Sequence, residues 1–286
     1  LRPLDEPEKL QAFIDNNLTA ISLEMIPRTT RAQAMDVLSS MATIAGYKAV
    51  LLATEKLPRM FPMLTTAAGT IPPARVLVVG AGVAGLQAIA TARRLGAVVE
   101  GFDIRAAAGE AVRSLGAKFL EIENVNAEGE GGYAKEVGED VMEKARGLLT
   151  KAAANADCII TTAQVPGKRA PVLITRDAVE AMKCGSAIVD LAGASGGNCE
   201  LSKPDEIVNH KGVFIYAPTN LPATIPVHAS QLFSRNVTAF CNLLAKDGAL
   251  NLDFSDDILS GSCIVHAGEI RSEGIKETVQ GSKFKA

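Results

Sequence analysis

Short apolar runs alternate with amphipathic stretches through the middle of the chain. Six runs have the length and the content of β-branched residues that buried strands require: residues 76–79, 98–102, 117–120, 158–162, 187–191 and 213–216. Between them, apolar residues recur at helical spacing, as in 85–96, 106–115 and 176–182. Strands that alternate with helices predict an α/β fold with a doubly wound parallel sheet of the Rossmann type.

The two ends of the chain follow another pattern. Residues 8–16 predict a polar helix and residues 20–24 a short strand. A helical pattern starts at Thr30 and runs to about Lys56, and Gly46 is expected to bend or break it; prolines between 58 and 73 then mark a linker. A long helix is expected over 228–246.

These patterns predict a division of the chain into three segments. Residues 1–40 are expected to be the remnant of an N-terminal domain with its linking helix, and 41–226 a nucleotide-binding Rossmann domain. Residues 227–286 are expected to be a helix that returns to the first domain, followed by a tail. The termini would then contribute a portion of a second α/β domain.

A glycine motif lies at the junction between the first apolar run and the helix that follows it. Gly80, Gly82 and Gly85 form G-x-G-x-x-G, and Asp103 ends the next apolar run 18 residues after Gly85. In a dinucleotide site, such glycines allow the turn, the approach of a pyrophosphate and close helix packing, while the acid binds the ribose 2′-hydroxyl. Glycines can also serve strand–helix packing alone, but the strand before, the helix after and the spaced acid favour a dinucleotide.

The acid at the strand end also bears on the choice of nucleotide. A carboxylate at Asp103 would repel a 2′-phosphate, which favours NAD over NADP. Arg105 lies two residues further on and could serve a 2′-phosphate instead. We expect the acid to decide, and NAD to be preferred.

Composition limits the classes of protein that the chain can belong to. The 286 residues are 48% hydrophobic and 21% charged, with a net charge of −3 and no basic stripe, so nucleic acid is not an expected partner. Five widely spaced cysteines without a C-x-x-C motif predict buried thiols in a reducing compartment rather than disulfides or a zinc site. The longest uncharged stretch, 76–92, is too short for a membrane span. The sequence has no signal peptide and no initiator Met, so we expect a piece of a longer protein.

A second set of polar residues precedes the first long helix. Arg28, Gln33, Asp36 and Ser39 are spaced so that Gln33 and Asp36 would share one face of a helix starting near Thr30, with Ser39 beside it. Such a face can hold a carboxamide. The alternative is purely structural, because Thr30 and Gln33 also form a capping box and Asp36 suits an early helical turn.

The segment 121–138 is rich in glycine and acidic residues, with Tyr133 as its one aromatic residue. It is either a solvated surface loop or a lid over a bound cofactor. The three histidines, His210, His228 and His266, lie far apart and outside any nucleophile motif, so surface or helix-end roles are expected for them.

Several strings occur together in order: PRTTRAQAMDVLSSMATIAGYKAV, AAGTIPPARVLVVGAGVAGLQAIATARRLGA, FDIRAA, GGYAKE, PGKRAPVLIT and GGN. From about residue 18 to 270 the chain thereby resembles the NAD(H)-binding component, domain I, of the α subunit of proton-translocating nicotinamide nucleotide transhydrogenases. Alanine dehydrogenases are similar in fold but share fewer of these strings.

The resemblance implies roles for the residues that match its motifs. The loop with Arg28, Gln33, Asp36 and Ser39 would position the nicotinamide, with Ser39 near the carboxamide and Gln33 reaching toward the partner's nucleotide. The implied contacts to NAD(H) are Gly80, Ala81, Gly82, Val83, Ala84, Gly85, Asp103, Ile104, Arg105, Gly132, Tyr133, Ala163, Gln164 and Asn198. Gly132 and Tyr133 belong to the family's mobile loop, which favours the lid interpretation.

Three departures from the family pattern are also present. Gln164 stands where Leu is usual, and Ala145 where Glu or Gln is usual. Residues 216–224 lack the usual Gly-Tyr or Gly-His opening and the Arg after the proline. They put the contact at Ala145 and partner docking at 216–224 in doubt.

The resemblance implies an Re/Si-specific, proton-translocating NAD(P) transhydrogenase that is active only with its partner. Hydride would pass from NADH held here to NADP+ on an NADP(H)-binding domain, and a membrane domain elsewhere would couple the transfer to proton translocation. It further implies a homodimer, no metal, and a place on the cytoplasmic or mitochondrial-matrix face of a membrane. Two alternatives stay open: an alanine-dehydrogenase-like oxidoreductase and a non-catalytic NAD-sensing subunit.

Overall fold

The computed structural model describes residues 3, 9–122, 127, 137–165, 167–272 and 275–276. Internal contacts divide the chain into two units, one of residues 1–41 with 226–286 and one of residues 42–225, here called the terminal unit and the sheet unit. The chain passes between them inside helix α2 (Val37–Lys56) and at the start of helix α7 (Pro226–Leu244). The expected assignment of 1–40, 41–226 and 227–286 as domains stays a prediction.

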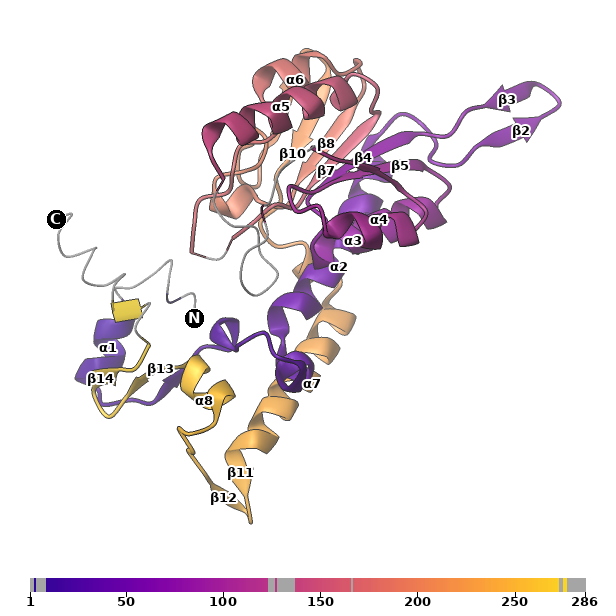
Figure 1. Ribbon diagram of the computed structural model, residues 1–286. Coiled ribbons are helices and arrows are strands. Elements are labelled where there is room, and N and C mark those ends of the chain that lie inside the picture. The colour runs from indigo at the N-terminus through magenta and orange to yellow at the C-terminus, as the bar shows by residue number, and fades with distance from the viewer. Residues whose placement is uncertain are drawn as a thin grey trace. The chain divides into compact units, whose positions relative to one another are not determined.

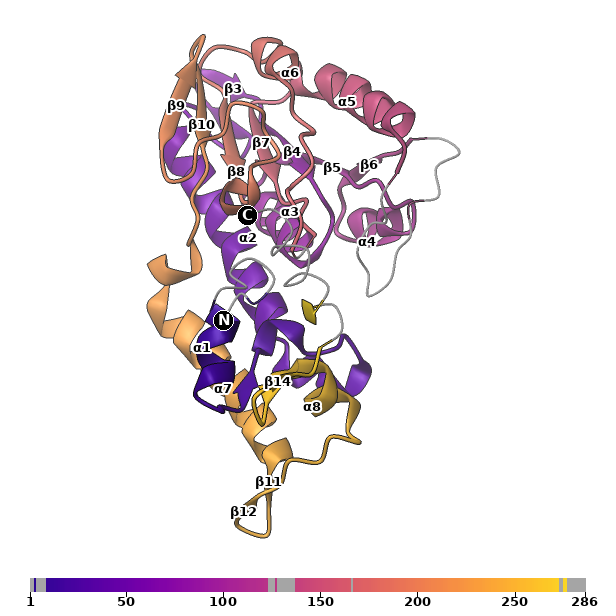
Figure 2. The same ribbon diagram turned by 90° about the vertical axis from the view of Figure 1, so that its left-hand side faces the viewer.

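The sheet unit is built on a seven-stranded sheet in the order β6-β5-β4-β7-β8-β10-β9 (Figures 1 and 2). Its strands are β4 (Arg75–Val79), β5 (Val98–Phe102), β6 (Lys118–Leu120), β7 (Cys158–Thr161), β8 (Ala187–Asp190), β9 (Ile207–His210) and β10 (Val213–Tyr216). All neighbours are parallel except β9, which pairs antiparallel with β10. The six strands expected from the apolar runs are therefore present, and the doubly wound α/β class is confirmed. The strand order reverses between β4 and β7, which is where such sheets bind ligands.

Alternation along the strands separates two apolar cores. Val76 and Val78 of β4 face one core together with Ile89 of α3, whereas Leu77 and Val79 face the other. The first core also contains α2, and the second contains α5 and α6. Because successive strand residues point to opposite faces, one short run supplies both cores. Figure 1 shows α3 and α4 on one side of the sheet and α5 and α6 on the other.

The helices of the sheet unit lie close to the predicted ranges. They are α3 (Val83–Arg94), α4 (Ala108–Ser114), α5 (Glu139–Ala153), α6 (Arg176–Glu180) and the 3-10 turns η4 (Gly193–Ser195) and η5 (Pro222–Thr224). Helix α2 is continuous through Gly46, so the expected bend or break there is wrong. A side chain at Gly46 would collide with the backbone of Ala84 in α3, so this glycine serves a close approach of two helices instead.

The segment expected to be a plain linker contains a hairpin. Strands β2 (Leu64–Thr66) and β3 (Gly69–Ile71) pair antiparallel, and every residue in them is exposed. Figure 1 shows this hairpin projecting from the sheet unit. Neither the hairpin nor the edge strand β9 is indicated by the apolar pattern.

The terminal unit joins segments from both ends of the chain. It contains α1 (Lys9–Asp15), β1 (Ala20–Ile21), the 3-10 turns η1 (Leu23–Met25) and η2 (Thr30–Met35), α7, β11 (Ala245–Lys246), β12 (Ala249–Leu250), α8 (Asp257–Ser262), β13 (Cys263–His266) and β14 (Glu269–Ile270). Strand β13 pairs antiparallel with β1 and β14. A small core lies between η2, α7 and α8 and includes Ala32, Met35, Phe240, Ile258 and Leu259.

The helix expected from Thr30 onward is interrupted. Residues 30–35 form a 3-10 turn, Asp36 is extended, and the α-helix begins only at Val37. The strand expected over 20–24 is likewise shorter, since residues 23–25 form η1.

All five cysteines are free, but only Cys158, Cys199 and Cys263 are buried. The expectation of buried thiols is wrong for Cys184 and Cys241, which are exposed. Burial disfavours the thiolate and raises the pKa of Cys158 to about 12 and that of Cys199 to about 11.

Among the described residues, α2 alone is long and apolar enough to meet the length and composition criterion for a membrane-crossing helix. A core helix meets the same criterion, and Ala49, Val50 and Ala53 of α2 are fully buried in the sheet unit.

Candidate functional site

The glycine turn connects β4 to α3 at the point where the strand order reverses. Gly80 has a φ of +98°, a conformation that favours glycine, and its N–H donates to Phe102 O at 2.7 Å. Thr162, just after β7, donates its hydroxyl to Gly80 O at 3.0 Å. The turn is thus fixed to β5 on one side and to the end of β7 on the other.

The three glycines of the motif have different surroundings. A Cβ at Gly85 would lie 2.8 Å from Gly80 C and closer still to Gly80 O, so glycine is needed there for packing of helix on strand. A Cβ at Gly82 would meet no protein atom within 4 Å, and its φ of −79° is open to any residue. Neither packing nor backbone conformation requires glycine at Gly82. Space kept clear above the start of α3 fits a pyrophosphate.

The start of α3 offers backbone donors to that space. Gly82 is the N-cap and carries no side chain that could occupy the first N–H groups of the helix. Gly82 and Val83 are exposed, Val83 by 39%. Unpaired N–H groups and the positive end of a helix dipole bind anions, so the chain's residues fit the phosphate part of a dinucleotide.

Asp103, at the end of β5, is the acid expected beside the adenosine ribose. It is only 8% exposed, and its Oδ2 accepts from Ala81 N at 2.8 Å, inside the glycine turn. Arg105 donates to the same carboxylate through Nε (2.9 Å), Nη2 (2.8 Å) and its backbone N–H (2.9 Å). The carboxylate therefore holds both the turn and Arg105, and Ile104 between them is half-buried.

The ends of β7 and β8 form the opposite wall. Ala163 N donates to Asn198 Oδ1 at 2.9 Å, and Asn198 Nδ2 donates to Ala163 O and Pro171 O, both at 2.8 Å. Asn198 is fully buried, so its amide fixes the turn at Ala163. Gln164 is exposed and donates to Leu191 O at 2.7 Å.

A buried carboxylate that the motifs did not single out supports this wall. Asp190, fully buried at the end of β8, accepts from Thr161 Oγ1 (2.8 Å), Ala192 N (2.9 Å), Cys199 N (3.0 Å) and Ser202 Oγ (2.6 Å). Four donors satisfy a charge that burial would otherwise make costly. Asp190 thereby shapes the glycine-rich loop that carries Asn198. Thr162 was also not singled out, although both follow apolar runs as Asp103 does.

The polar residues expected to hold a nicotinamide lie in the terminal unit. Arg28 and Gln33 are exposed, while Asp36 and Ser39 are half-buried. Asp36 accepts from Ser39 N at 2.8 Å through Oδ1 and from Ser39 Oγ at 2.6 Å through Oδ2. Asp36 thus caps α2 and orients Ser39. The expected shared helical face of Gln33 and Asp36 is absent because η2 and α2 are separate elements.

The capping-box alternative is also wrong. Thr29, not Thr30, is the N-cap of η2, and its side chain makes no cap hydrogen bond. The structural interpretation of Asp36 is correct in kind, since its carboxylate does begin a helix.

Other expected positions are placed less directly. Gly132 and Tyr133, and with them most of the expected lid, lie outside the described residues. Ala145 is fully buried in the core under α5. In the segment 216–224, Asp205 accepts from the N–H and hydroxyl of Thr219 at 2.9 and 2.6 Å.

The histidines make separate contacts. His210 Nε2 lies 2.8 Å from Glu180 Oε1, and Thr19 Oγ1 lies 2.9 Å from His266 Nδ1. His228 is exposed in the first turn of α7. Over the ranges that the structure describes, His, Cys, Asp and Glu side chains form no group of three or more able to hold a metal ion.

Sheet order, glycine turn and strand-end acid define a Rossmann protein of the dinucleotide-binding type. The chain belongs to the alanine dehydrogenase/PNT family: residues 1–45 match its N-terminal domain and residues 49–273 its C-terminal domain. It is 48% identical over 266 residues to the first polypeptide of the divided NAD(P) transhydrogenase subunit alpha of Rhodospirillum rubrum, an alignment covering 91% of this chain and 69% of that polypeptide. The resemblance seen in the motifs is confirmed.

Two solved structures show the same architecture. The transhydrogenase from Sinorhizobium meliloti matches with a TM-score of 0.85 at 41% identity, covering 94% of this chain and 73% of that chain. An L-alanine dehydrogenase matches with a TM-score of 0.78 at 25% identity, covering 97% and 73%.

Proposed function

We propose that the chain is the NAD(H)-binding component of an Re/Si-specific, proton-translocating NAD(P) transhydrogenase. NADH bound here supplies a hydride to NADP+ held on a partner domain, and a membrane domain elsewhere couples the transfer to proton translocation. The observation that carries the proposal is the dinucleotide cradle at Gly80–Gly85, in which Gly82 is kept clear for a ligand rather than for packing. The similarity to transhydrogenase α subunits supports the choice of reaction.

Within this proposal the residues divide into two groups. Those at the glycine turn and strand ends bind the pyrophosphate and adenosine ribose of NAD(H), with Asp103 accepting from the 2′-hydroxyl. Arg28, Gln33, Asp36 and Ser39 orient the nicotinamide. Asp36 has a definite task there, since it fixes the Ser39 hydroxyl from which a carboxamide could accept or to which it could donate.

Direct transfer between two nicotinamides needs no side-chain acid or base, which agrees with the scattered histidines. It does need the second nucleotide close by, with reacting atoms about 3–3.5 Å apart. Only one G-x-G-x-x-G motif occurs in the chain, so NADP(H) must come on another domain.

The test is to mix the chain with a transhydrogenase NADP(H)-binding domain and to follow NADH-dependent reduction of thio-NADP+. Transfer should require both components, and Gln33→Ala should lower its rate strongly while leaving NADH affinity nearly unchanged. Rapid transfer by this chain alone, or none with the partner supplied, would refute the proposal.

A homodimer and a peripheral position on the cytoplasmic or mitochondrial-matrix face of a membrane complex complete the proposal. The β2–β3 hairpin supports self-association, because an isolated two-stranded hairpin is marginal in water and exposes Met63 by 63% and Ile71 by 47%. Sedimentation should give twice the chain mass, and Met63→Ser with Ile71→Ser should shift it toward the monomer. A monomeric wild-type chain at micromolar concentration would contradict the expected homodimer.

An alanine-dehydrogenase-like reaction is the second candidate, favoured by the structural match to L-alanine dehydrogenase. NADH oxidation by pyruvate and ammonia would support it. Saturable NADH binding with neither reaction would instead favour an NAD-sensing subunit.

A further inference from the structure

The segment that carries Gln33 is short of internal support. Turn η2 is a 3-10 helix, in which hydrogen-bond geometry is poorer than in an α-helix. Its Asp36 N donates to Gln33 O at 3.3 Å and its Ala32 N to Thr29 O at 3.1 Å. Gln33 itself is exposed. The position of Gln33 therefore depends on what holds η2 from outside.

Buried side chains supply some of that hold. Ala32 is 1% exposed and Met35 9% exposed, and both pack in the core with Phe240, Ile258 and Leu259. Residues three apart eclipse in a 3-10 helix, so these two define one edge of η2. Apolar packing is not directional, and the rotation of the turn needs polar contacts as well.

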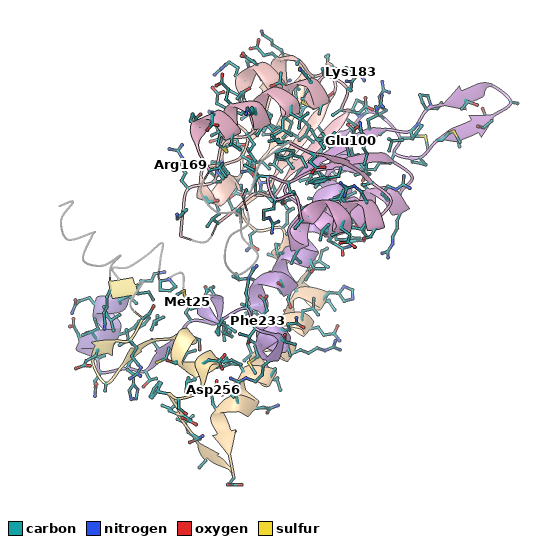
Figure 3. All side chains as sticks on the ribbon, viewed as in Figure 1. Met25, Glu100, Arg169, Lys183, Phe233 and Asp256 are labelled. Carbon is teal, nitrogen blue, oxygen red and sulfur yellow. The ribbon has the colours of Figure 1, made fainter. Side chains whose placement is uncertain are left out.

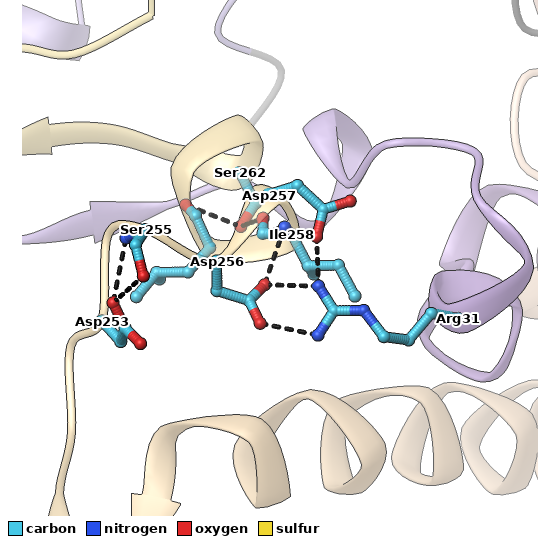
Figure 4. Close-up of polar contacts among 8 residues, drawn as sticks. Arg31, Asp253, Ser255, Asp256, Asp257, Ile258 and Ser262 are labelled. Carbon is cyan, nitrogen blue, oxygen red and sulfur yellow. Dashed lines mark hydrogen bonds and ion pairs between the residues drawn. The ribbon is translucent and has the colours of Figure 1, made fainter.

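Two such contacts fall on a second edge, at Arg31 and Ala34, which are also three residues apart. Arg31 Nη1 donates to Asp256 Oδ2 at 2.6 Å and Nη2 to Asp256 Oδ1 at 2.8 Å, and Nη2 also pairs with Asp257 (Figure 4). Asn236 Nδ2 in α7 donates to Ala34 O at 2.8 Å. These contacts bracket Gln33 on both sides.

The acceptor side is itself fixed. Asp256 caps α8 by accepting from Ile258 N at 2.9 Å, and Figure 3 labels it at the start of that helix. Asp253 holds the preceding turn by accepting from Ser255 N and Oγ at 3.0 and 2.6 Å. Ile258 and Leu259 are buried. A planar guanidinium bound at two points to such a group transmits orientation as well as charge.

We propose that Arg31, through Asp256 and Asp257, is a positioning residue that sets the orientation of Gln33 for hydride transfer. This inference rests on the proposed function. The side chain of Arg31 is 51% exposed and that of Asp257 59%, and exposed ion pairs contribute little to stability. Loss of the pair should therefore leave the fold intact and misplace Gln33, and a misplacement of about 1 Å can lower a rate about 100-fold.

The test compares Arg31→Met, Arg31→Lys and Asp256→Asn in the assay with the added NADP(H)-binding domain. Asn is also a good N-cap, so Asp256→Asn removes the charged acceptor while keeping the cap. Arg31→Met should lower the transfer rate about 10- to 100-fold with an unchanged Kd for NADH. Arg31→Lys should restore some of the rate, and the double variant Arg31→Met with Asp256→Asn should be no slower than the single one.

Arg176→Met is the matched control, because Arg176 is 52% exposed and lies 3.9 Å from Glu200 in the sheet unit. Its transfer rate should equal that of the wild type. Amide hydrogen exchange at Ala32 and Asp36 gives a second readout without catalysis and should accelerate in Arg31→Met. Unchanged exchange, or equal rates for Arg31→Met and Arg176→Met, would overturn the inference. Absence of transfer in the wild-type mixture would overturn the proposed function and the inference together.

Discussion

Gly46→Ala probes the junction between α2 and the nucleotide cradle. In an ordinary helix interior, replacing Gly by Ala stabilises by about 1 kcal/mol. Here the added Cβ would lie 2.9 Å from Ala84 C, 3.0 Å from Ala84 Cα and closer still to Ala84 O. Carbon atoms pack best at about 3.5–4.0 Å. The two helices must therefore move apart by about 1 Å, against backbone that cannot rotate away.

The clash should outweigh the gain in helix propensity. Overpacking a core costs about 1–3 kcal/mol, and a backbone collision belongs at the upper end of that range. We expect a net loss of about 1–2 kcal/mol in the free energy of unfolding. Ala84 lies in the first turn of α3, so the anion-binding N–H groups should shift too and the Kd for NADH should rise about tenfold, or about 1.4 kcal/mol.

Gly147→Ala is the control for helix propensity, because a Cβ at Gly147 in α5 would meet nothing within 4 Å. It should raise stability by about 0.5–1 kcal/mol and leave the Kd unchanged. Urea unfolding and an NADH fluorescence titration measure both quantities. A Gly46→Ala protein that behaves like Gly147→Ala would refute the close-approach argument.

Three further outcomes follow from the structure. Gly82→Ala should alter stability by less than about 0.5 kcal/mol and still weaken NADH binding at least about tenfold in a titration, whereas unchanged affinity would show that no phosphate occupies the cradle. Asp103→Ala should release Arg105 and narrow the preference for NADH over NADPH, and adding Arg105→Ala should cancel any gain in NADPH affinity; a double variant that keeps the gain would contradict this pairing. Iodoacetamide at pH 8 should modify the two exposed thiols first, since the pKa of Cys158 is raised to about 12 and its thiolate is scarce at that pH. Mass spectrometry would contradict this assignment if it found Cys158 labelled as fast as Cys184.

The central strands were predictable because they are buried on both faces. A strand such as Val76–Val79 carries apolar residues at every position, since it serves two cores at once. Edge elements lack that signal. Strand β9 reads Ile-Val-Asn-His and is at most half-buried, and the β2–β3 hairpin is exposed throughout, so neither has an apolar pattern that marks it as a strand.

The glycine turn was predictable in location and in the separate tasks of two glycines. Gly80 needs its positive φ, and Gly85 needs room beside Gly80 O. The wall opposite was not, because it depends on hydrogen bonds between residues 29 to 35 positions apart, such as Thr161 with Asp190 and Ala163 with Asn198. Sequence spacing carries no information about such pairs until the sheet order is known.

Turn η2 shows why spacing alone misplaced the nicotinamide residues. Over six residues a 3-10 helix with a period of 3.0 and an α-helix with a period of 3.6 give nearly the same apolar pattern. Ala32 and Met35 fit either. The distinction lies in Asp36, whose carboxylate accepts from Ser39 N and so starts a new helix instead of continuing the old one. Arg28 and Gln33 therefore belong to a segment oriented by Arg31 and α8, and Ser39 to the helix that Asp36 caps. Replacements at Arg31 and at Asp36 should consequently act on different members of the same set.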